Sequence, residues 1–197
     1  CIHLQRQYSA SREYEEYMRA EHDPDDASLV KYVAALKKGR DNETKLNNGY
    51  MTKQLGEPVK FGDVVQLFHC KSGKYVTVRP ADLAQQEREN MSVKLNPHGN
   101  VYSWFVITPR FKIDRDGDIV QDASEMFLKV SERQNEFMHV AEHQPVEGHY
   151  REVNCSLETT AWKMNIFQSA THAADTSLLL ASQLVYINDP ETLANLS

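Results

Sequence analysis

The sequence predicts a mainly β protein: a β-trefoil whose first repeat is largely missing, with an inserted helix-turn-helix arm and a short helical carboxy-terminal tail. From residue 57 onward, apolar and polar residues alternate in short runs between polar turns, which is typical of an all-β barrel or sandwich. The strand–turn–strand units also repeat, because Tyr75 and Phe137 lie 62 residues apart and Trp104 and Trp162 lie 58 residues apart. Before them, residues 1–56 carry apolar residues at helical spacing.

The helical region has two segments. In the first, Ser11 is the expected cap, and Tyr14, Tyr17 and Met18 share one face. Pro24 interrupts the pattern. The second segment is capped by Ser28 and is expected to end near Gly39 or to fray toward Gly49; its apolar stripe is Leu29, Val33 and Leu36. Together with an apolar stub at residues 1–4, these helices make up a first region, residues 1–56.

Residues 57–168 form the second region, with two trefoil repeats. The expected strands are residues 64–69, 74–78, 104–108, 126–130, 137–140 and 162–167. Two repeats cannot close a barrel, so we interpret Cys1-Ile2-His3-Leu4 as the closing strand of a third unit. Residues 169–197 form the third region, expected to be helical and outside the trefoil core, because the apolar residues of 177–187 cover more than one helix face before Pro190.

Composition excludes several classes of protein. At 197 residues, 41% hydrophobic and 25% charged, the chain has an ordinary globular composition. Its net charge is −6 and its basic residues are scattered, which argues against a nucleic-acid surface or a polybasic membrane patch. No apolar run approaches the roughly 20 residues of a membrane-spanning helix. Three cysteines without a CxxC pair indicate a reducing compartment, and the start at Cys1 without a leader indicates a fragment.

Candidate sites of chemistry are few. Asp114-Arg115-Asp116-Gly117-Asp118 superficially resembles a calcium loop, but its glycine falls at position 4 where an EF-hand needs it at position 6, so a charged turn is expected. The histidines at 139, 143 and 149 are expected on the surface, without a metal. Trp104, Trp162, Tyr75 and Phe137 are expected in the core, and Cys70 as an ordinary free thiol. No nucleophile, base and orienting group occur together, so neither a catalytic site nor a cofactor is predicted.

The first repeat carries a family resemblance. The run from Phe61 to Val78, FGDVVQLFHCKSGKYVTV, resembles the MIR-type trefoil repeat of inositol 1,4,5-trisphosphate receptors, ryanodine receptors and protein O-mannosyltransferases. Further pieces resemble, in order, the amino-terminal suppressor domain of the inositol trisphosphate receptors. They are Asn42-Glu43-Thr44, Leu55-Gly56, Gly99-Asn100, Ser103-Trp104-Phe105, Glu152-Val153-Asn154 and Trp162-Lys163. The helical arm also matches, and the resemblance covers residues 1–168.

The resemblance implies a regulatory, non-catalytic domain of a ligand-gated calcium-release channel on the cytoplasmic face of the endoplasmic reticulum. Such a domain tunes ligand affinity and couples binding to gating. Inositol trisphosphate would bind elsewhere in the full protein, because no cluster of Arg and Lys suited to a polyphosphate is evident. The densest basic run, Lys37-Lys38-Gly39-Arg40, is expected at a helix end, where cations are favourable. The expected partners are the following ligand-binding domains and neighbouring subunits of a tetramer, with the membrane reached through other parts of the protein.

Two tyrosines of the arm, Tyr14 and Tyr17, are the candidate interface residues for such a partner. Two alternatives stay open. One is a lumenal, carbohydrate-associated MIR domain as in protein O-mannosyltransferases, which would suit the sequons at Asn42, Asn90, Asn154 and Asn195. The other is a ryanodine-receptor-like amino-terminal domain.

Overall fold

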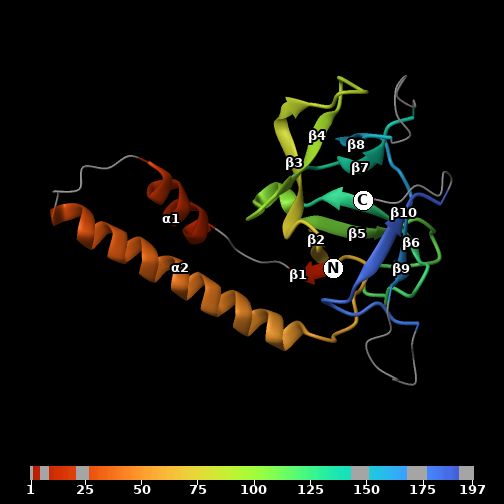
Figure 1. Cartoon of the computed structure of the whole chain (residues 1–197). Helices are drawn as coiled ribbons and strands as arrows, with labels where there is room; N and C mark the ends of the chain where they lie inside the picture. Colours follow the sequence, from red (N-terminus) through yellow and green to blue (C-terminus); the bar gives the residue numbers. More distant parts are fainter. Residues whose placement is uncertain (1, 5–8, 21–26, 143–150, 168–176, 191–197) are drawn as a thin grey trace. The chain divides into compact units, whose positions relative to one another are not determined.

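The computed structural model describes residues 2–4, 9–20, 27–142, 151–167 and 177–190. It divides into two compact units: the arm, residues 6–54, and the trefoil unit, residues 1–5 and 55–197 (Figure 1). The arm holds α1 (Ser9–Arg19) and α2 (Ala27–Gln54). The described strands of the trefoil unit are β1 (Ile2–Leu4), β2 (Val64–His69), β3 (Lys74–Leu83), β4 (Met91–Asn96), β5 (Phe105–Pro109), β6 (Glu125–Val130), β7 (Phe137–Val140), β8 (Val153–Ser156), β9 (Trp162–Ile166) and β10 (Val185–Asn188).

Seven strands close into a ring, in which neighbours pair in the order β2–β3–β4–β8–β7–β6–β5 and β5 returns to β2. β1 adds to β2, and β9 and β10 continue outward from β6. All these pairs are antiparallel. The prediction of a mainly β trefoil-type barrel is therefore confirmed.

The same tight turn precedes β2, β6 and β10. In each turn the backbone N–H of the fourth residue donates to the carbonyl of the first, and the side-chain oxygen of the fourth accepts from the N–H of the first. These residue pairs are Lys60 and Asp63, Gln121 and Ser124, and Leu180 and Gln183. The third residue of each turn has positive φ: Gly62 (91°), Ala123 (63°) and Ser182 (67°). Three copies of one turn identify a pseudo-threefold arrangement.

A ring of three hydrogen bonds lies directly before these turns. Val59 N–H donates to the Leu179 carbonyl over 2.8 Å, Leu179 N–H to the Val120 carbonyl over 2.9 Å, and Val120 N–H to the Val59 carbonyl over 2.8 Å. All three side chains are fully buried. We call Val59, Val120 and Leu179 the axial ring, because each residue donates its N–H to one of the other two and accepts the N–H of the remaining one at its carbonyl.

Strand register completes the threefold pattern. Ile107 pairs with Leu128 between β5 and β6, Met164 pairs with Ile187 between β9 and β10, and Ile2 pairs with Leu67 between β1 and β2. Leu67, Leu128 and Ile187 occupy the same position after their turns, so β1 stands where β5 and β9 stand in the other units. This register supports the interpretation of the stub as the closing strand of a third unit. That unit consists of the turn at residues 180–183, β10 and β1.

The prediction of a helical tail is wrong for residues 177–190. This segment forms the third turn and β10, and Leu179 and Ile187 belong to the core cluster. Between Val185 and Ile187, which face the core, Tyr186 points outward and is exposed, so the segment follows the period of a strand. A short apolar run does not distinguish a buried strand from a buried helix by its periodicity alone. The proposed second tail helix at residues 191–196 lies outside the described residues.

The core of the trefoil unit contains Trp162 as predicted, with its Nε1–H donating to the Met138 carbonyl over 3.0 Å. The tryptophan anchor of the repeat is offset by one residue from the prediction. Phe105 pairs with Val65 as Trp162 pairs with Met126, so Phe105, not Trp104, is the counterpart of Trp162. Phe105 is fully buried, whereas Trp104 is half-buried.

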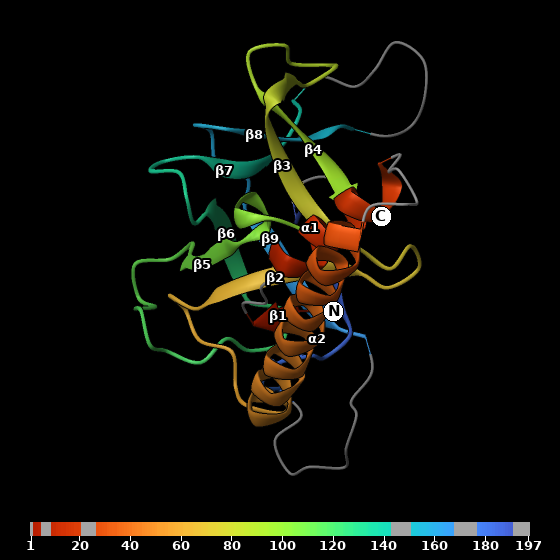
Figure 2. The same cartoon turned by 90° about the vertical axis from the view of Figure 1, so that its left-hand side faces the viewer.

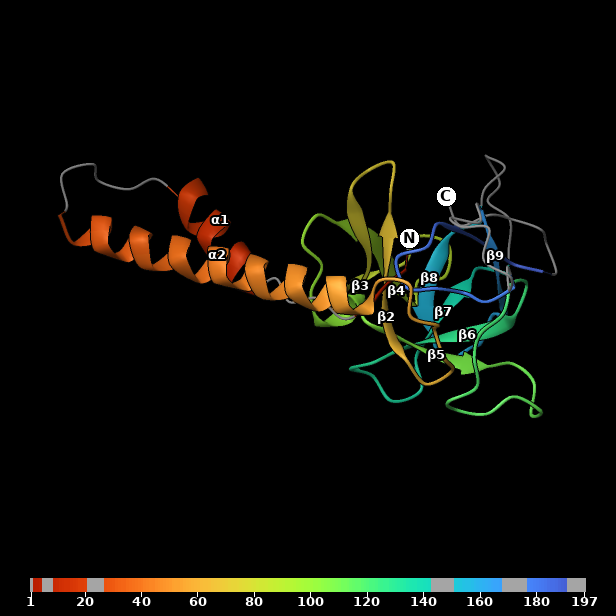
Figure 3. The same cartoon turned by 90° about the horizontal axis from the view of Figure 1, so that it is seen from below.

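Within the arm, α1 lies alongside the first part of α2, as Figures 2 and 3 show from two directions. The prediction that the second helix ends near Gly39 or frays by Gly49 is wrong, because α2 continues to Gln54. A glycine inside a helix costs only about 1 kcal/mol relative to Ala. Gly39 also faces α1, where a Cβ built on it would meet the Ala10 Cβ at 3.7 Å, an ordinary packing distance.

Candidate functional site

The arm is stabilised where α1 begins. The backbone N–H of Ala10, in the first turn of α1, donates a hydrogen bond to the Glu43 carboxylate of α2. A carboxylate suits this position, because the first N–H groups of a helix lack partners within the helix and the helix dipole is positive there. Glu43 is buried and replaces a local cap, while Ser11, the expected cap, lies inside the helix.

Both candidate interface tyrosines are half-buried against α2. The guanidinium carbon of Arg40 lies 4.4 Å from the ring centroid of Tyr14, a cation–π distance. The hydrogen bond from Arg40 to Asp41 raises the pKa of Arg40. Tyr17 packs edge-on against Tyr32 at a centroid distance of 5.1 Å. Each tyrosine therefore helps to hold the two helices together, and an additional role at an interface stays a prediction.

A more exposed apolar surface lies further along α2. Leu46 and Tyr50 are separated by one helical turn, and their side chains are 65% and 41% exposed. Both follow Glu43, which accepts the hydrogen bond from the N–H of Ala10 in the first turn of α1. Sequence reasoning missed this pair because it ended the second helix too early; the i, i+4 spacing of Leu46 and Tyr50 was the available signal.

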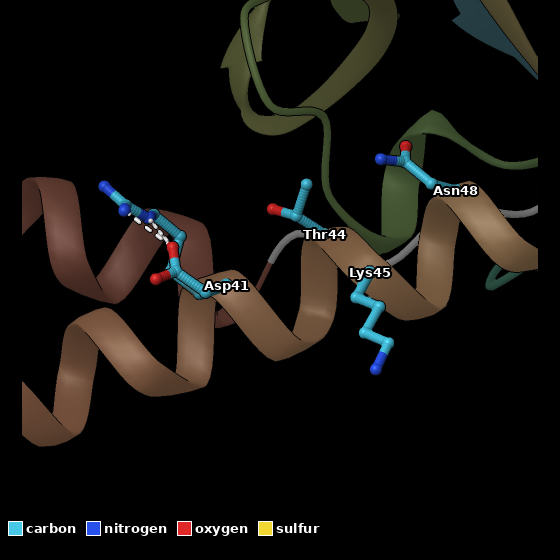
Figure 4. A pocket seen from close by; sticks show the side chains of 5 residues that line it. Asp41, Thr44, Lys45 and Asn48 are labelled. Atoms are coloured by element: carbon cyan, nitrogen blue, oxygen red, sulfur yellow. Dashed lines mark hydrogen bonds and ion pairs between the residues drawn. The ribbon is translucent and has the colours of Figure 1, made fainter.

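A shallow hollow of about 540 Å³ lies on α2, lined by Arg40, Asp41, Thr44, Lys45 and Asn48 (Figure 4). In Figure 4, Lys45 points away from Thr44 and Asn48. Arg40 forms an ion pair with Asp41. A polyphosphate needs several cations that converge. The hollow does not provide them. The basic run at residues 37–40, expected at a helix end, lies instead in the middle of α2.

The calcium-like loop is an ordinary charged turn. The Asp118 carboxylate accepts the N–H of Arg115 over 2.8 Å, and Gly117 has a φ of 95°. Within the described ranges, no group of three His, Cys, Asp or Glu side chains is arranged to hold a metal ion. Nor does any described helix have the length and apolar character that crossing a membrane requires.

The free cysteines differ in environment. Cys70 is exposed in the β2–β3 turn, and Cys155 is buried in β8. Burial raises the pKa of Cys155 to about 12, with a further increase from the Glu136 charge, so this thiol stays protonated. Cys1 lies outside the described residues.

His139 contradicts the prediction of a surface histidine, because it is only 5% exposed. It lies on β7, and the other two histidines of that prediction, His143 and His149, fall outside the described residues. Its Nδ1 lies 2.9 Å from Thr160 Oγ1, and its Nε2 lies 3.3 Å from a Glu158 carboxylate oxygen and 3.7 Å from one of Glu87. The strand pattern places residue 139 opposite Asn154 of β8, which the sequence did not reveal.

Comparison with known proteins assigns the family. The profile described as "Inositol 1,4,5-trisphosphate/ryanodine receptor" matches residues 1–173. The chain belongs to this receptor family. The chain is also 35% identical over 144 residues to the inositol 1,4,5-trisphosphate receptor itr-1 of Caenorhabditis elegans. That match covers 67% of this chain and 5% of the receptor. The predicted resemblance to inositol trisphosphate receptors is thus confirmed, and the named relative is a receptor rather than an enzyme.

Solved structures support the fold alone. The SDF2-like protein of Arabidopsis thaliana matches with a TM-score of 0.59 at 19% identity, covering 70% of this chain and 76% of that one. The Saccharomyces cerevisiae protein O-mannosyltransferase Pmt1–Pmt2 complex matches with a TM-score of 0.60 at 15% identity, covering 72% and 21%. A Caenorhabditis elegans protein of unknown function matches with a TM-score of 0.59 at 16% identity, covering 72% and 79%.

Proposed function

We propose that this chain is a regulatory, non-catalytic module of an intracellular calcium-release channel of the inositol trisphosphate receptor type. The observation that carries the proposal is the family match over residues 1–173, combined with the 35% identity to a named receptor. The module acts on ligand affinity and gating through contacts whose strength differs between the liganded and unliganded channel. Its location is the cytoplasmic face of the endoplasmic reticulum, and its partners are the following domains and neighbouring subunits of a tetramer.

Contacts that favour the unliganded arrangement lower the apparent affinity for inositol trisphosphate, because part of the binding energy then goes into shifting the conformational equilibrium. The direct test compares the ligand-binding region of the same receptor with and without this module. The measured affinity should be higher without it. Equal affinities would contradict the suppressor role.

Leu46 and Tyr50 are the part of the arm that best suits a partner surface, because they are apolar, exposed and adjacent. In the full receptor, the double variant Leu46→Ser, Tyr50→Ser should weaken the coupling between ligand binding and channel opening. The matched control is Val30→Ser, which removes another exposed apolar side chain of the same helix. Equal coupling in both variants and in the wild type would exclude this surface. The same comparison with Tyr14→Phe and Tyr17→Phe tests the predicted tyrosines, since both rings are kept.

A lumenal, carbohydrate-associated role is the second candidate, favoured by the structural likeness to the SDF2-like protein and to the mannosyltransferase complex. Two of the sequons of this chain are poor glycan acceptors in the folded state. Asn154 is fully buried, and the Nδ2 atoms of both Asn90 and Asn154 donate to Glu87. Asn42 is exposed on α2. Peptide mapping of protein from cells that found a glycan on Asn42 would favour the lumenal role, whereas an unmodified Asn42 would favour the channel.

A further inference from the structure

The buried imidazole of His139 lies between carboxylates from two different loops. Glu87 belongs to the connection between β3 and β4, and Glu158 to the connection between β8 and β9. The Nε2 atom of His139 is buried and makes no hydrogen bond of good geometry within the described residues, although both carboxylates lie within 3.7 Å. A buried polar atom without a hydrogen bond is unfavourable unless a charge interaction compensates for it.

The two carboxylates are held very differently. Glu87 accepts hydrogen bonds from Asn90 Nδ2 over 2.9 Å, from Asn154 Nδ2 over 2.7 Å and from the Glu142 N–H over 2.9 Å. Burial disfavours its charge, but the bonds from Asn154 and Glu142, the His139 charge and the Asn90 bond outweigh burial and lower the pKa of Glu87. The Glu158 side chain, by contrast, is 67% exposed, and its described ion-pair contact is with His139.

The other groups around the ring are neutral or engaged. Asn154 faces His139 from β8 and is bonded to Glu87. The Thr160 hydroxyl accepts the Val140 N–H over 3.0 Å and also contacts His139 Nδ1. The Glu152 carboxylate, near the start of β8, accepts the N–H groups of Gln85 and Gln86. Among the described residues, Glu87 and Glu158 are therefore the two carboxylates within ion-pair distance of the ring.

We propose that His139, Glu158 and Thr160 form a proton-operated latch, in which a protonated His139 holds the β8–β9 loop against β7 and a neutral His139 releases it. When both ring nitrogens carry protons, Nδ1–H donates to Thr160 and Nε2–H is directed toward Glu158. The cation then lies between two negative charges. Loss of the proton removes this attraction, and histidine changes its charge between about pH 5 and 8.

The release is one-sided. Glu87 keeps its three hydrogen bonds from Asn90, Asn154 and Glu142 at either charge of His139, so the β3–β4 connection stays in place. Glu158 has no comparable set in the described structure, so the loop that carries it and the exposed Leu157 moves away. The protonation state of His139 thus determines the position of one surface loop of the trefoil unit.

Two backbone N–H groups report on the two sides separately. The Val140 N–H is bonded to Thr160 and reports on the β8–β9 loop, whereas the Glu142 N–H is bonded to Glu87 and reports on the β3–β4 connection. The experiment is amide hydrogen exchange of the full 197-residue chain at pH 5.5 and pH 8.5, each corrected for the intrinsic exchange rate. From pH 5.5 to 8.5, the protection of Val140 should fall roughly two- to fivefold, the size expected for one partly exposed charge pair. The protection of Glu142 should not change.

Variants separate the latch from a general effect of pH. Glu158→Gln should remove the pH dependence at Val140, whereas the control Glu132→Gln, which neutralises another exposed carboxylate of the trefoil, should leave it unchanged. His139→Gln should also abolish it; if that variant does not fold, Glu158→Gln decides the question alone. The proposal would be overturned if the protection of the Val140 N–H did not depend on pH or if Val140 and Glu142 responded equally. It would also be overturned if Glu158→Gln and the control Glu132→Gln had equal effects.

Discussion

Replacing Leu179 by Ala should lower the free energy of unfolding of the trefoil unit by about 2–5 kcal/mol, the range for fully buried leucines. The Leu179 side chain has no exposed surface, and its backbone joins the axial ring through bonds to Val59 and Val120. The substitution keeps both backbone bonds and removes only side-chain volume. The cost therefore comes from lost burial and from the cavity left at the axis.

The assay is chemical denaturation followed by tryptophan fluorescence, which reports on the trefoil unit because both tryptophans, Trp104 and Trp162, lie in it. The matched control is Leu157→Ala, the same change at a leucine that is 74% exposed, where an effect within about 0.5 kcal/mol is expected. If Leu179→Ala were as mild as Leu157→Ala, residues 177–190 would not be part of the core.

The threefold arrangement makes the prediction stricter. Val59→Ala and Val120→Ala remove fewer carbon atoms at the two equivalent positions and should each cost about 1–3 kcal/mol. All three positions should respond as members of one core. A large cost at the two valines with none at Leu179 would show that the third unit is absent in solution.

Three further predictions concern single contacts of the trefoil unit. Trp162→Phe leaves the Met138 carbonyl without its indole donor and should cost about 1–3 kcal/mol in the same denaturation assay, with Trp104 as the remaining fluorophore. The pKa of Glu87 is lowered from 4.5, so its contribution to stability is fully present above about pH 4.5 and is lost as the pH falls through its folded-state pKa. Glu87→Gln should therefore reduce the loss of stability on acidification. An unchanged loss of stability at acid pH would contradict this. Ala123→Gly, at a φ of 63°, should raise stability by up to about 1 kcal/mol, whereas Gly62→Ala, at a φ of 91°, should lower it by at least as much; equal signs would contradict the strain argument.

The two central repeats of the trefoil could be predicted from the sequence, because each strand alternates over a half-buried surface. Strand β6 shows this directly, since Met126, Leu128 and Val130 are fully buried and Phe127 and Lys129 are not. The repeat of such strands then pointed to a trefoil. What periodicity did not give was the register, because Trp104 and Phe105 are adjacent aromatics and only strand pairing shows that Phe105 is the counterpart of Trp162.

The candidate sites were less accessible to sequence reasoning, because their residues come from separate segments. His139 meets Glu87, which lies 52 positions earlier, and Glu158, which lies 19 positions later, and no local pattern links the three. Likewise Glu43 bonds the N–H of Ala10 across 33 positions, so the sequence suggested Ser11 as the cap instead. Long-range polar contacts of this kind follow from the fold and cannot be found before it is known.

The third unit explains how the arm is joined to the barrel. The arm leaves the trefoil unit after β1 and returns at Leu55, and β1 is the closing strand of that third unit. Four residues after Leu55 the chain reaches Val59 of the axial ring, and on the way the Glu57 carbonyl accepts the Ala181 N–H over 2.9 Å. One end of the arm is therefore joined covalently to β1 of the third unit, and the other end leads to Glu57, which is hydrogen-bonded to the turn of that unit. The third unit is built from the two ends of the described chain. Because the three units share the axial ring, a substitution that displaced Val59 would disturb its hydrogen bonds to both Leu179 and Val120 and so reach all three units.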